Sequence, residues 1–258
     1  MMLDTLSSSE RQQQIVRLLS RQQRLSVAEI CGQFSISEAT ARRDLESLAE
    51  QGKIQRVHGG AIPVEQVPPE LPILQRENEQ ANEKQRIGQA AAALVQDGET
   101  VFLSSGTTVL EAARALRGRQ NLTVITNSLA VVNALAGAEG VAVICLGGML
   151  RNSELSFIGH ITELALAELR ADKILIGTRA ISLEFGLTNE YLPETLTDRA
   201  ILKAGREIIV LADYTKFGHT ATVLLAPLER IQTLVTDERT PSEFTESIKK
   251  RGIRLLIA

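Results

Sequence analysis

The segment from Ser37 to Ala61, SEATARRDLESLAEQGKIQRVHGGA, limits the possible folds of this chain more than any other stretch. Ala41, Leu45 and Leu48 lie at helical spacing, so they form a narrow apolar stripe on one side of a helix. Gly52 is suited to end that helix, and the residues after it alternate polar with apolar until two glycines turn the chain. The segment therefore predicts a helix followed by a short two-stranded wing.

The residues upstream complete this unit. Ser26 and Glu29 have the spacing of a capping box at the start of a second helix, and apolar residues around Ile15 predict a first one. The turn from Phe34 to Ser37 is brief, as a helix-turn-helix requires. We therefore predict a winged helix-turn-helix domain over residues 1–61, whose third helix enters the major groove of DNA.

Polar and basic side chains lie opposite the apolar stripe and along the wing. The predicted DNA-contacting residues are Ser37, Thr40, Arg42, Arg43, Lys53, Arg56 and His58. The alternative is a plain amphipathic helix whose arginines face solvent or pair with Asp44 and Glu46. Charge alone does not exclude it, because residues 1–60 hold eight Lys or Arg against seven acids. The placement of the basic residues on one helix and its wing favours DNA binding.

Length and proline content divide the chain into domains. With 258 residues, 44% of them hydrophobic, the chain is long enough for two cores. Four of the seven prolines lie within ten residues after the wing, where they disfavour a helix and stiffen the chain: Pro63, Pro68, Pro69 and Pro72. We predict an interdomain linker over residues 62–75 and a second domain over residues 76–258.

The second domain alternates between helical patterns and short apolar runs typical of buried strands. Such alternation predicts an α/β fold with a largely parallel sheet covered by helices on both faces. The predicted strands are Thr100 to Leu103, Leu122 to Thr126, Val141 to Leu146, Lys173 to Gly177, Glu207 to Ala212, Thr222 to Leu225, Gln232 to Val235 and Ile253 to Ile257.

Polar residues follow the first three of these strands. Ser104 to Thr108 opens a helix, so its N–H groups and hydroxyls can cradle a phosphate at the positive end of the helix dipole. Thr126 to Ser128 and Gly147-Gly148 follow the next two strands, and Lys203, Asp213 and Lys216 can add charge. Each feature alone is as often an ordinary capped turn, loop or solvated charge. Their coincidence at strand ends favours a shared site for an anionic ligand.

Two parts of the chain resemble the DeoR family of bacterial transcriptional regulators. Residues 26–61 resemble its N-terminal motif through RRDL, the glycine after the helix and HGGA, although many members have Ile or Val where Ala41 stands. Residues 84–240 resemble its effector domain through FLSSGTT, LTVITNSL, LGGMLR and LADYTKFG. The family typically has aspartate at the Ser104 position, and residues 179–190 follow its pattern only loosely.

This resemblance implies a fold, a ligand and a set of binding residues. The effector domain of the family is similar in fold to ribose-5-phosphate isomerase and the coenzyme A transferases, and members typically sense phosphorylated sugars or related metabolites. Carried over position by position, the predicted effector-binding residues are Ser105, Gly106, Thr107, Thr108, Thr126, Asn127, Ser128, Gly148, Arg151, Lys203, Asp213 and Lys216.

Two classes of function follow from these observations. The first is a homo-oligomeric repressor of carbohydrate-catabolic genes that a phosphorylated sugar releases from operator DNA. The second is a sugar-phosphate isomerase carrying a DNA-binding extension, with Asp213 and Lys203 or Lys216 as acid and base. We favour the first, because the acidic residues match no recognisable catalytic motif.

Other residue patterns limit which partners and which cellular compartment we expect. No run of about 18 apolar residues or signal peptide is present, so we expect a cytoplasmic protein without membrane contact. The three histidines are scattered, so we expect neither a metal nor a cofactor, and we expect Cys31 and Cys145 to be buried free thiols.

Overall fold

The computed structural model describes residues 8–22, 24–50, 54–57, 59–63 and 70–258. Its contacts group into two compact units, Met1–Gln66 and Val67–Ala258. Each unit has its own hydrophobic core. The boundary falls within the stretch that we predicted as a linker. Within that stretch, Pro63 belongs to a strand of the first unit and Ile73 to a helix of the second.

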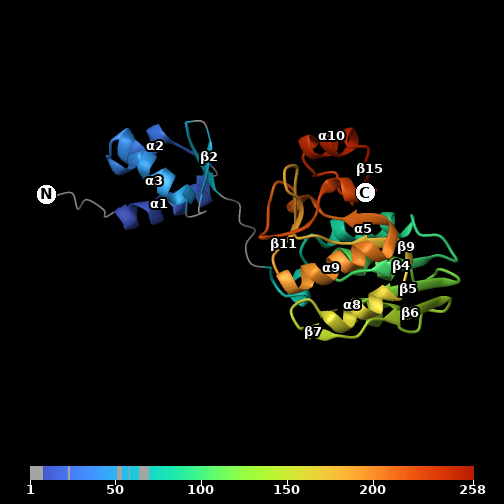
Figure 1. Ribbon diagram of the computed structural model, residues 1–258. Helices are drawn as coiled ribbons and strands as arrows, with labels where there is room; N and C mark the ends of the chain where they lie inside the picture. Colours follow the sequence, from blue (N-terminus) through green and yellow to red (C-terminus); the bar gives the residue numbers. More distant parts are fainter. Residues whose placement is uncertain (1–7, 23, 51–53, 58, 64–69) are drawn as a thin grey trace. The chain divides into compact units, whose positions relative to one another are not determined.

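The N-terminal unit is a three-helix bundle with a small sheet (Figure 1). In chain order its elements are α1 (Ser8–Gln22), β1 (Leu25–Ser26), α2 (Val27–Phe34), α3 (Glu38–Glu50), β2 (Ile54–Val57) and β3 (Gly60–Pro63). Strands β2 and β3 form the predicted antiparallel hairpin, and β1 pairs with β3. This arrangement is a winged helix-turn-helix, as predicted.

Apolar residues at the predicted positions hold this unit together. Ala41, Leu45 and Leu48 of α3 are buried against Ile15 of α1 and Ile30 of α2. The capping box at the start of α2 is present: the Glu29 amide donates to Ser26 Oγ at 3.2 Å, and the Ser26 amide donates to Glu29 Oε2 at 2.7 Å. Helical spacing and capping chemistry are thus enough to specify this unit.

The C-terminal unit is built on a seven-stranded, fully parallel sheet of strand order β15-β14-β12-β9-β4-β5-β6. These strands are β4 (Thr100–Leu103), β5 (Leu122–Thr126), β6 (Val141–Cys145), β9 (Ala171–Ile176), β12 (Gly205–Leu211), β14 (Thr233–Thr236) and β15 (Arg254–Ile257). The prediction of a largely parallel α/β sheet is confirmed.

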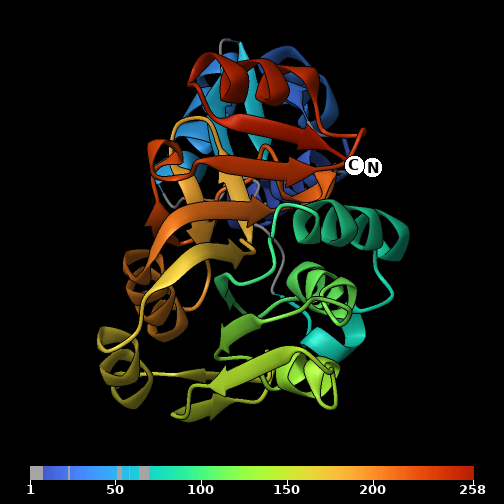
Figure 2. The same ribbon diagram turned by 90° about the vertical axis from the view of Figure 1, so that its right-hand side faces the viewer.

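Helices cover both faces of this sheet (Figure 2). One face packs on α5 (Ala81–Ala92), α6 (Thr107–Ala115) and α7 (Leu129–Leu135), and the other on α8 (His160–Ala167), α9 (Leu192–Ala204) and α10 (Ser242–Lys250). Successive residues of β4 point to opposite faces, since Val101 and Leu103 join the first core and Phe102 the second. The sheet is therefore buried on both sides.

One predicted strand lies outside the parallel sheet. Residues Val223–Ala226 form β13, which pairs antiparallel with β11 (Gly186–Asn189), and β11 pairs with β10 (Ala180–Ser182). A second small sheet joins β7 (Met149–Arg151) to β8 (Ser156–Ile158). Strands β7, β8, β10 and β11 were not predicted, because they are three or four residues long and lack a clear apolar run.

The order of the strands creates a switch point between β4 and β9. From β4 the chain adds β5 and β6 on one side, then returns to place β9 on the other side of β4. In parallel α/β sheets, ligands bind beyond the carboxyl ends of the strands at such a point. None of the helices in the described part of the chain combines the length and apolar character needed to cross a bilayer.

Candidate functional site

The start of α3 is organised by Ser37, one of the predicted DNA-contacting residues. The Thr40 amide donates to Ser37 Oγ at 3.3 Å, and the Ala41 amide donates to the Ser37 carbonyl at 3.0 Å. The hydroxyls of Ser37 and Thr40 lie 2.9 Å apart in a hydrogen bond. This cap satisfies N–H groups that a helix leaves unpaired and fixes where α3 begins.

The predicted basic contacts of α3 and the wing lie on the surface. Arg42 and Arg43 are exposed, and Arg42 pairs with Glu38 one turn away at 3.2 Å. Arg56 on β2 is exposed and lies 3.9 Å from Glu46. Exposed pairs of this kind contribute little energy, so these arginines can exchange their partners for phosphate or bases at small cost. Lys53 and His58 lie outside the described residues.

Asp44 has a different role from its exposed neighbours. Its carboxylate is buried and accepts hydrogen bonds from three side chains of α1: Arg11 at 2.6 Å, and Ser8 and Gln12 each at 3.2 Å. Desolvation opposes its ionisation, but the hydrogen bonds from Arg11, Gln12 and Ser8 and the charge of Arg11 outweigh it and hold the pKa of Asp44 below its ordinary value. Asp44 therefore ties α3 to α1 and does not pair with the predicted DNA-contacting arginines.

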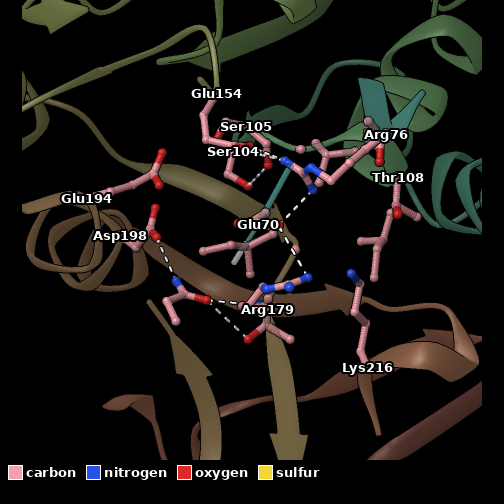
Figure 3. Close-up of a pocket in the computed structure, with 18 of the residues that line it drawn as sticks. Glu70, Arg76, Ser104, Ser105, Thr108, Glu154, Arg179, Glu194, Asp198 and Lys216 are labelled. Atoms are coloured by element: carbon pink, nitrogen blue, oxygen red, sulfur yellow. Dashed lines mark hydrogen bonds and ion pairs between the residues drawn. The ribbon is translucent and has the colours of Figure 1, made fainter. Parts of the chain in front are cut away.

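A pocket lies at the switch point of the parallel sheet (Figure 3). The residues that follow β4, β9 and β12 line it: Ser104 to Val109, Gly177 to Arg179, and Lys216. The cavity measures about 70 Å³, several times the roughly 10–15 Å³ that one water molecule needs. It has room for several water molecules or one small anion.

The N-terminal end of α6 forms one wall of this pocket. Gly106 precedes the helix with φ +119°, a backbone conformation that side chains disfavour, and no other atom lies within 4 Å of where its Cβ would be. Ser105, Gly106, Thr107 and Thr108, four of the predicted effector-binding residues, all line the pocket. The wall thus presents backbone N–H groups, two threonine hydroxyls and the positive end of a helix dipole, which together suit an anion.

Two lysines lie beside this wall, Lys84 buried and Lys216 half-buried. Lys84 of α5 and Lys216 line the same pocket, and neither forms an ion pair within the part of the chain that the structure describes. Burial lowers the pKa of both, while the charge of Asp213 opposes the shift. In Figure 3 the Lys216 side chain extends toward Thr108. Two desolvated lysines next to a helix N-terminus favour an anionic ligand, because its negative charge would balance their positive charge.

Arginines and acids form the rest of the lining. Arg76 of α4 (Ile73–Arg76) donates to both carboxylate oxygens of Glu154, at 2.6 and 2.5 Å, and pairs with Glu70 at 2.8 Å. Arg179 lies 3.9 Å from Glu70 and 3.7 Å from Glu190. These residues come from four separate segments, so the network ties the start of this unit to the sheet.

A second group of charges lies around the start of α9. Arg151, a predicted effector-binding residue, lines the pocket, pairs with Glu194, and has its Cζ 4.5 Å from the centre of the Tyr191 ring. Asp198 is buried and accepts a hydrogen bond from Asn189 Nδ2 at 3.1 Å. Burial raises the pKa of Asp198 to about 7, although the charge of Arg151 opposes this shift. The Asp198 carboxyl therefore changes charge near neutral pH.

Four of the predicted effector residues have structural partners and do not line the pocket. Thr126 Oγ1 donates to the Leu103 carbonyl at 2.7 Å, Asn127 Nδ2 donates to the Phe157 carbonyl at 3.0 Å, and Ser128 caps α7. Gly148 gives room to Thr162, whose Oγ1 would lie 2.2 Å from an added Cβ. These residues follow β5 and β6, whereas the pocket is built on β4, β9 and β12.

The two remaining predicted residues are also separate from the lining. Lys203 is exposed on α9 and lines a different, shallow surface depression with Glu163 and Arg170. Asp213 is fully buried, accepts from the Thr215 amide at 3.0 Å, and affects the pocket through its charge on Lys84 and Lys216. The structure therefore does not bring Lys203 to Asp213, as the isomerase alternative would need if Lys203 were its base.

Sequence reasoning missed most of the charged lining. The missed charged residues are Glu70, Arg76, Lys84, Glu154, Arg179, Glu190, Glu194 and Asp198. Several lie on helices with ordinary polar faces, where a charge is usually solvated. No pattern in the sequence distinguishes them, since their burial depends on which segments pack together.

Neither cysteine is fully buried. Cys31 and Cys145 are free thiols, but Cys31 is half-buried and Cys145 is exposed on β6, so the expectation of burial was wrong. Strand β6 lies at the edge of the sheet, which leaves part of it open. No group of three or more His, Cys, Asp and Glu side chains among the described residues is arranged to hold a metal ion.

Both units match models of known protein families. Residues 11–67 match the DeoR-like helix-turn-helix domain, and residues 79–238 match the DeoR C terminal sensor domain. The second match covers more than half of the chain and includes most of the residues that line the pocket.

Similar proteins match over nearly their whole length. The transcriptional repressor AccR of Agrobacterium fabrum is 36% identical over 235 residues, which are 91% of this chain and 91% of that protein. The glycerol-3-phosphate regulon repressor of Escherichia coli is 33% identical over 251 residues, or 97% of this chain and 99% of that protein. Among solved structures, ribose 5-phosphate isomerase A from Methanocaldococcus jannaschii aligns with TM-score 0.41 and 18% identity over 54% of this chain and 55% of that one.

Proposed function

Because this chain belongs to the DeoR family of transcriptional regulators, we propose that it represses genes of carbohydrate catabolism and that a phosphorylated sugar or related metabolite releases it from its operator. The N-terminal unit binds double-stranded operator DNA, and the C-terminal unit binds the metabolite. The active form is a homo-oligomer, because helix-turn-helix proteins commonly read two half-sites about one turn of DNA apart.

This proposal rests on one observation: Lys84, Lys216 and the N-terminal end of α6 line the same pocket at the switch point. A phosphate group brings up to two negative charges and three acceptor oxygens. It would accept hydrogen bonds from the N–H groups and hydroxyls of Thr107 and Thr108, while the two lysines balance its charge. Among common metabolites, phosphorylated ones match this chemistry best.

The acidic side of the pocket suits the hydroxyl groups of a sugar. Glu194 and Asp198 lie across the pocket from Thr108 (Figure 3), and carboxylates accept hydrogen bonds from sugar hydroxyls. The names of the relatives agree, since one of them is the repressor of the glycerol-3-phosphate regulon. A ligand with a phosphate at one end and hydroxyls at the other fits both sides.

The first prediction separates DNA binding from metabolite binding by mutation. Arg43→Ala should weaken operator binding by roughly 5- to 150-fold, because a contact to a base or phosphate is worth about 1–3 kcal/mol, while leaving metabolite binding unchanged. Lys216→Gln or Thr107→Ala should do the reverse and weaken metabolite binding about tenfold or more. Operator DNA selected from a random pool by the native chain, and a thermal-shift panel of pentose and hexose phosphates, provide the two measurements.

Lys203→Gln is the matched control for Lys216→Gln. It removes the same charge from a lysine that is exposed and outside the pocket, so phosphate affinity should stay at the native value. The proposal fails if no phosphorylated metabolite raises the melting temperature, or if Lys203→Gln weakens binding as much as Lys216→Gln. It also fails as a pure sensor if the chain isomerises a sugar phosphate and Asp213→Asn abolishes that turnover.

A further inference from the structure

The pocket already contains a carboxylate held where an anion would bind. Glu70 Oε1 lies 2.8 Å from Arg76 Nη1 and 3.9 Å from Arg179 Nη1, and its charge acts on Lys216. In Figure 3 Glu70 lies between the two arginines, with dashed lines to both. The Glu70 carboxylate is therefore an internal anion among the cations of the pocket.

Glu70 also begins the segment that carries the chain into the C-terminal unit. It lies four positions after Gln66, the last residue of the N-terminal unit. We call residues 70–76 the strap. The far end of the strap is anchored without Glu70, because Arg76 pairs with Glu154 and the Ile73 amide donates to the Ser153 carbonyl at 2.7 Å.

The near end of the strap is held by Glu70 and by the hydrogen bond from Arg76 Nε to the Leu71 carbonyl at 2.7 Å. The Glu70 amide donates to Glu190 Oε2 at 3.1 Å, and the Glu70 carboxylate makes the two ion pairs described above. If Glu70 leaves, Arg76 keeps its ion pair with Glu154 through Nη2, and Arg179 keeps its pair with Glu190, so neither arginine loses its last acidic partner. The Glu70 carboxylate is thus a releasable contact beside a fixed anchor.

We propose that Glu70 is an intramolecular competitor of the metabolite: the phosphate displaces its carboxylate from Arg76 and Arg179 and so frees the near end of the strap, which leads to the DNA-binding unit. This inference rests on the proposed phosphate site, and it adds how that site is coupled to the DNA-binding unit. A phosphate dianion outcompetes one carboxylate because it carries more charge and more acceptor oxygens.

The coupling follows from differential binding. A ligand shifts an equilibrium between two states only if it binds them unequally. Here the Glu70 carboxylate, while in place, repels the phosphate and balances the charge of Arg76 and Arg179. Its release removes the repulsion and makes both arginines available to the phosphate in addition to Lys84 and Lys216. Phosphate therefore binds the released state more tightly and makes it the major one.

The test measures inorganic phosphate affinity in the intact chain by calorimetry at constant pH. Glu70→Gln removes the competing charge, and Glu70→Asp keeps the charge but is one methylene too short to hold the same ion pairs. Both variants should bind phosphate about fivefold tighter or more, in the usual range of allosteric couplings. Glu77→Gln is the matched control, since Glu77 follows the strap, pairs with Arg114 at 3.7 Å outside the pocket, and should leave phosphate affinity unchanged.

A second measurement follows the strap itself by hydrogen exchange. Between Pro68 and Pro72 the exchangeable backbone amides are those of Glu70 and Leu71, because prolines have none. Phosphate should speed exchange at the Glu70 amide in the native chain, because its hydrogen bond to Glu190 is lost, and in both Glu70 variants this amide should already exchange fast without phosphate. The Ile73 amide, which belongs to the anchor, should exchange at the same rate in every case.

The outcomes separate this inference from the proposed function. The phosphate site stands if the native chain binds phosphate and Lys216→Gln weakens that binding. The competitor role of Glu70 is nevertheless wrong if the Glu70 variants bind phosphate no more tightly, or if phosphate does not change exchange at the Glu70 amide. Tighter binding by Glu70→Gln with native affinity in Glu70→Asp would mean simple charge repulsion and would also overturn it. If neither phosphate nor any sugar phosphate binds, both proposals fall.

Discussion

Adjacent residues of α3 have opposite environments. Arg42 and Arg43 are exposed, whereas Asp44 is buried and held by three side chains of α1. The carboxylate of Asp44 is oriented by Arg11 on the inner side of the helix, so the arginines that precede it face solvent. One buried acid thus helps to set which face of α3 is presented to DNA.

Replacing Asp44 by asparagine tests this role of the buried acid. This change should destabilise the N-terminal unit by about 1.5–3 kcal/mol at pH 7, because hydrogen bonds to charged groups are worth that much. Since folding lowers the pKa of Asp44, its contribution is present above the ordinary pKa of an aspartate and is lost as pH falls through the lower, folded value. Native and variant chains should therefore differ less near pH 2 than at pH 7.

Hydrogen exchange at the buried amides of α3, combined with urea titrations followed by circular dichroism, measures this difference. Glu38→Gln is the comparison, because it removes an acid from the same helix whose ion pair with Arg42 is exposed. It should change stability much less than Asp44→Asn. Equal effects of the two variants would contradict the role assigned to Asp44.

Individual helices and strands were the features of this molecule that the sequence predicted best. Seven of the eight predicted strands lie in the parallel sheet, because strands buried on both faces have apolar runs that can be recognised without a structure. The prediction failed for the short strands β7, β8, β10 and β11, which pair in small antiparallel sheets. It also placed β13 in the wrong sheet, since an apolar run does not specify its partner.

The element-scale prediction compares two helical glycines. Gly88 lets α5 approach α6 so closely that an added Cβ would lie 2.6 Å from Glu111 Cβ and 2.7 Å from the Ala112 amide nitrogen. Alanine usually stabilises a helix by about 1 kcal/mol relative to glycine, but overpacking costs about 1–3 kcal/mol. The clash is partly with backbone, so Gly88→Ala should destabilise the C-terminal unit.

Gly32 of α2 is the control, because no other atom lies within 4 Å of where its Cβ would be. Gly32→Ala should therefore keep the helix-propensity gain and stabilise the N-terminal unit by up to about 1 kcal/mol. Unit-resolved hydrogen exchange gives both values. A stabilising Gly88→Ala would show that α5 and α6 can move apart at little cost.

At the scale of the whole C-terminal unit, the pocket balances five cationic side chains against five acidic ones. The cations are Arg76, Lys84, Arg151, Arg179 and Lys216, and the acids are Glu70, Glu154, Glu190, Glu194 and Asp198. The arginines pair with glutamates, and burial depresses the pKa of both lysines. While Glu70 is in place, Lys84 and Lys216 are therefore the cations of the lining for which the described residues provide no ion pair.

The molecule-scale prediction is a pH dependence of phosphate binding. A bound anion raises the pKa of Lys84 and Lys216, so phosphate affinity should fall as pH rises through their free-state pKa values, which burial places under 10.5. Calorimetry from pH 8 to 10.5 avoids the titration of Asp198 at about 7. Lys216→Gln should bind more weakly and show a smaller decline, and an unchanged native affinity across this range would contradict the prediction.

Local patterns along the chain were enough to predict the winged helix-turn-helix, its exposed basic residues and the parallel α/β sheet, because periodicity and capping act over a few neighbouring residues. They were also enough for the loop of Ser105 to Thr108 at the end of β4. The tertiary structure decided what faces that loop. The sheet order places β9 and β12 beside β4 on the pocket side and moves Thr126 to Ser128 and Gly148 into structural roles. Packing of distant segments then brings the half-buried Glu70 to the buried Arg76 and Lys84, and no spacing along the chain specifies which distant segments will meet.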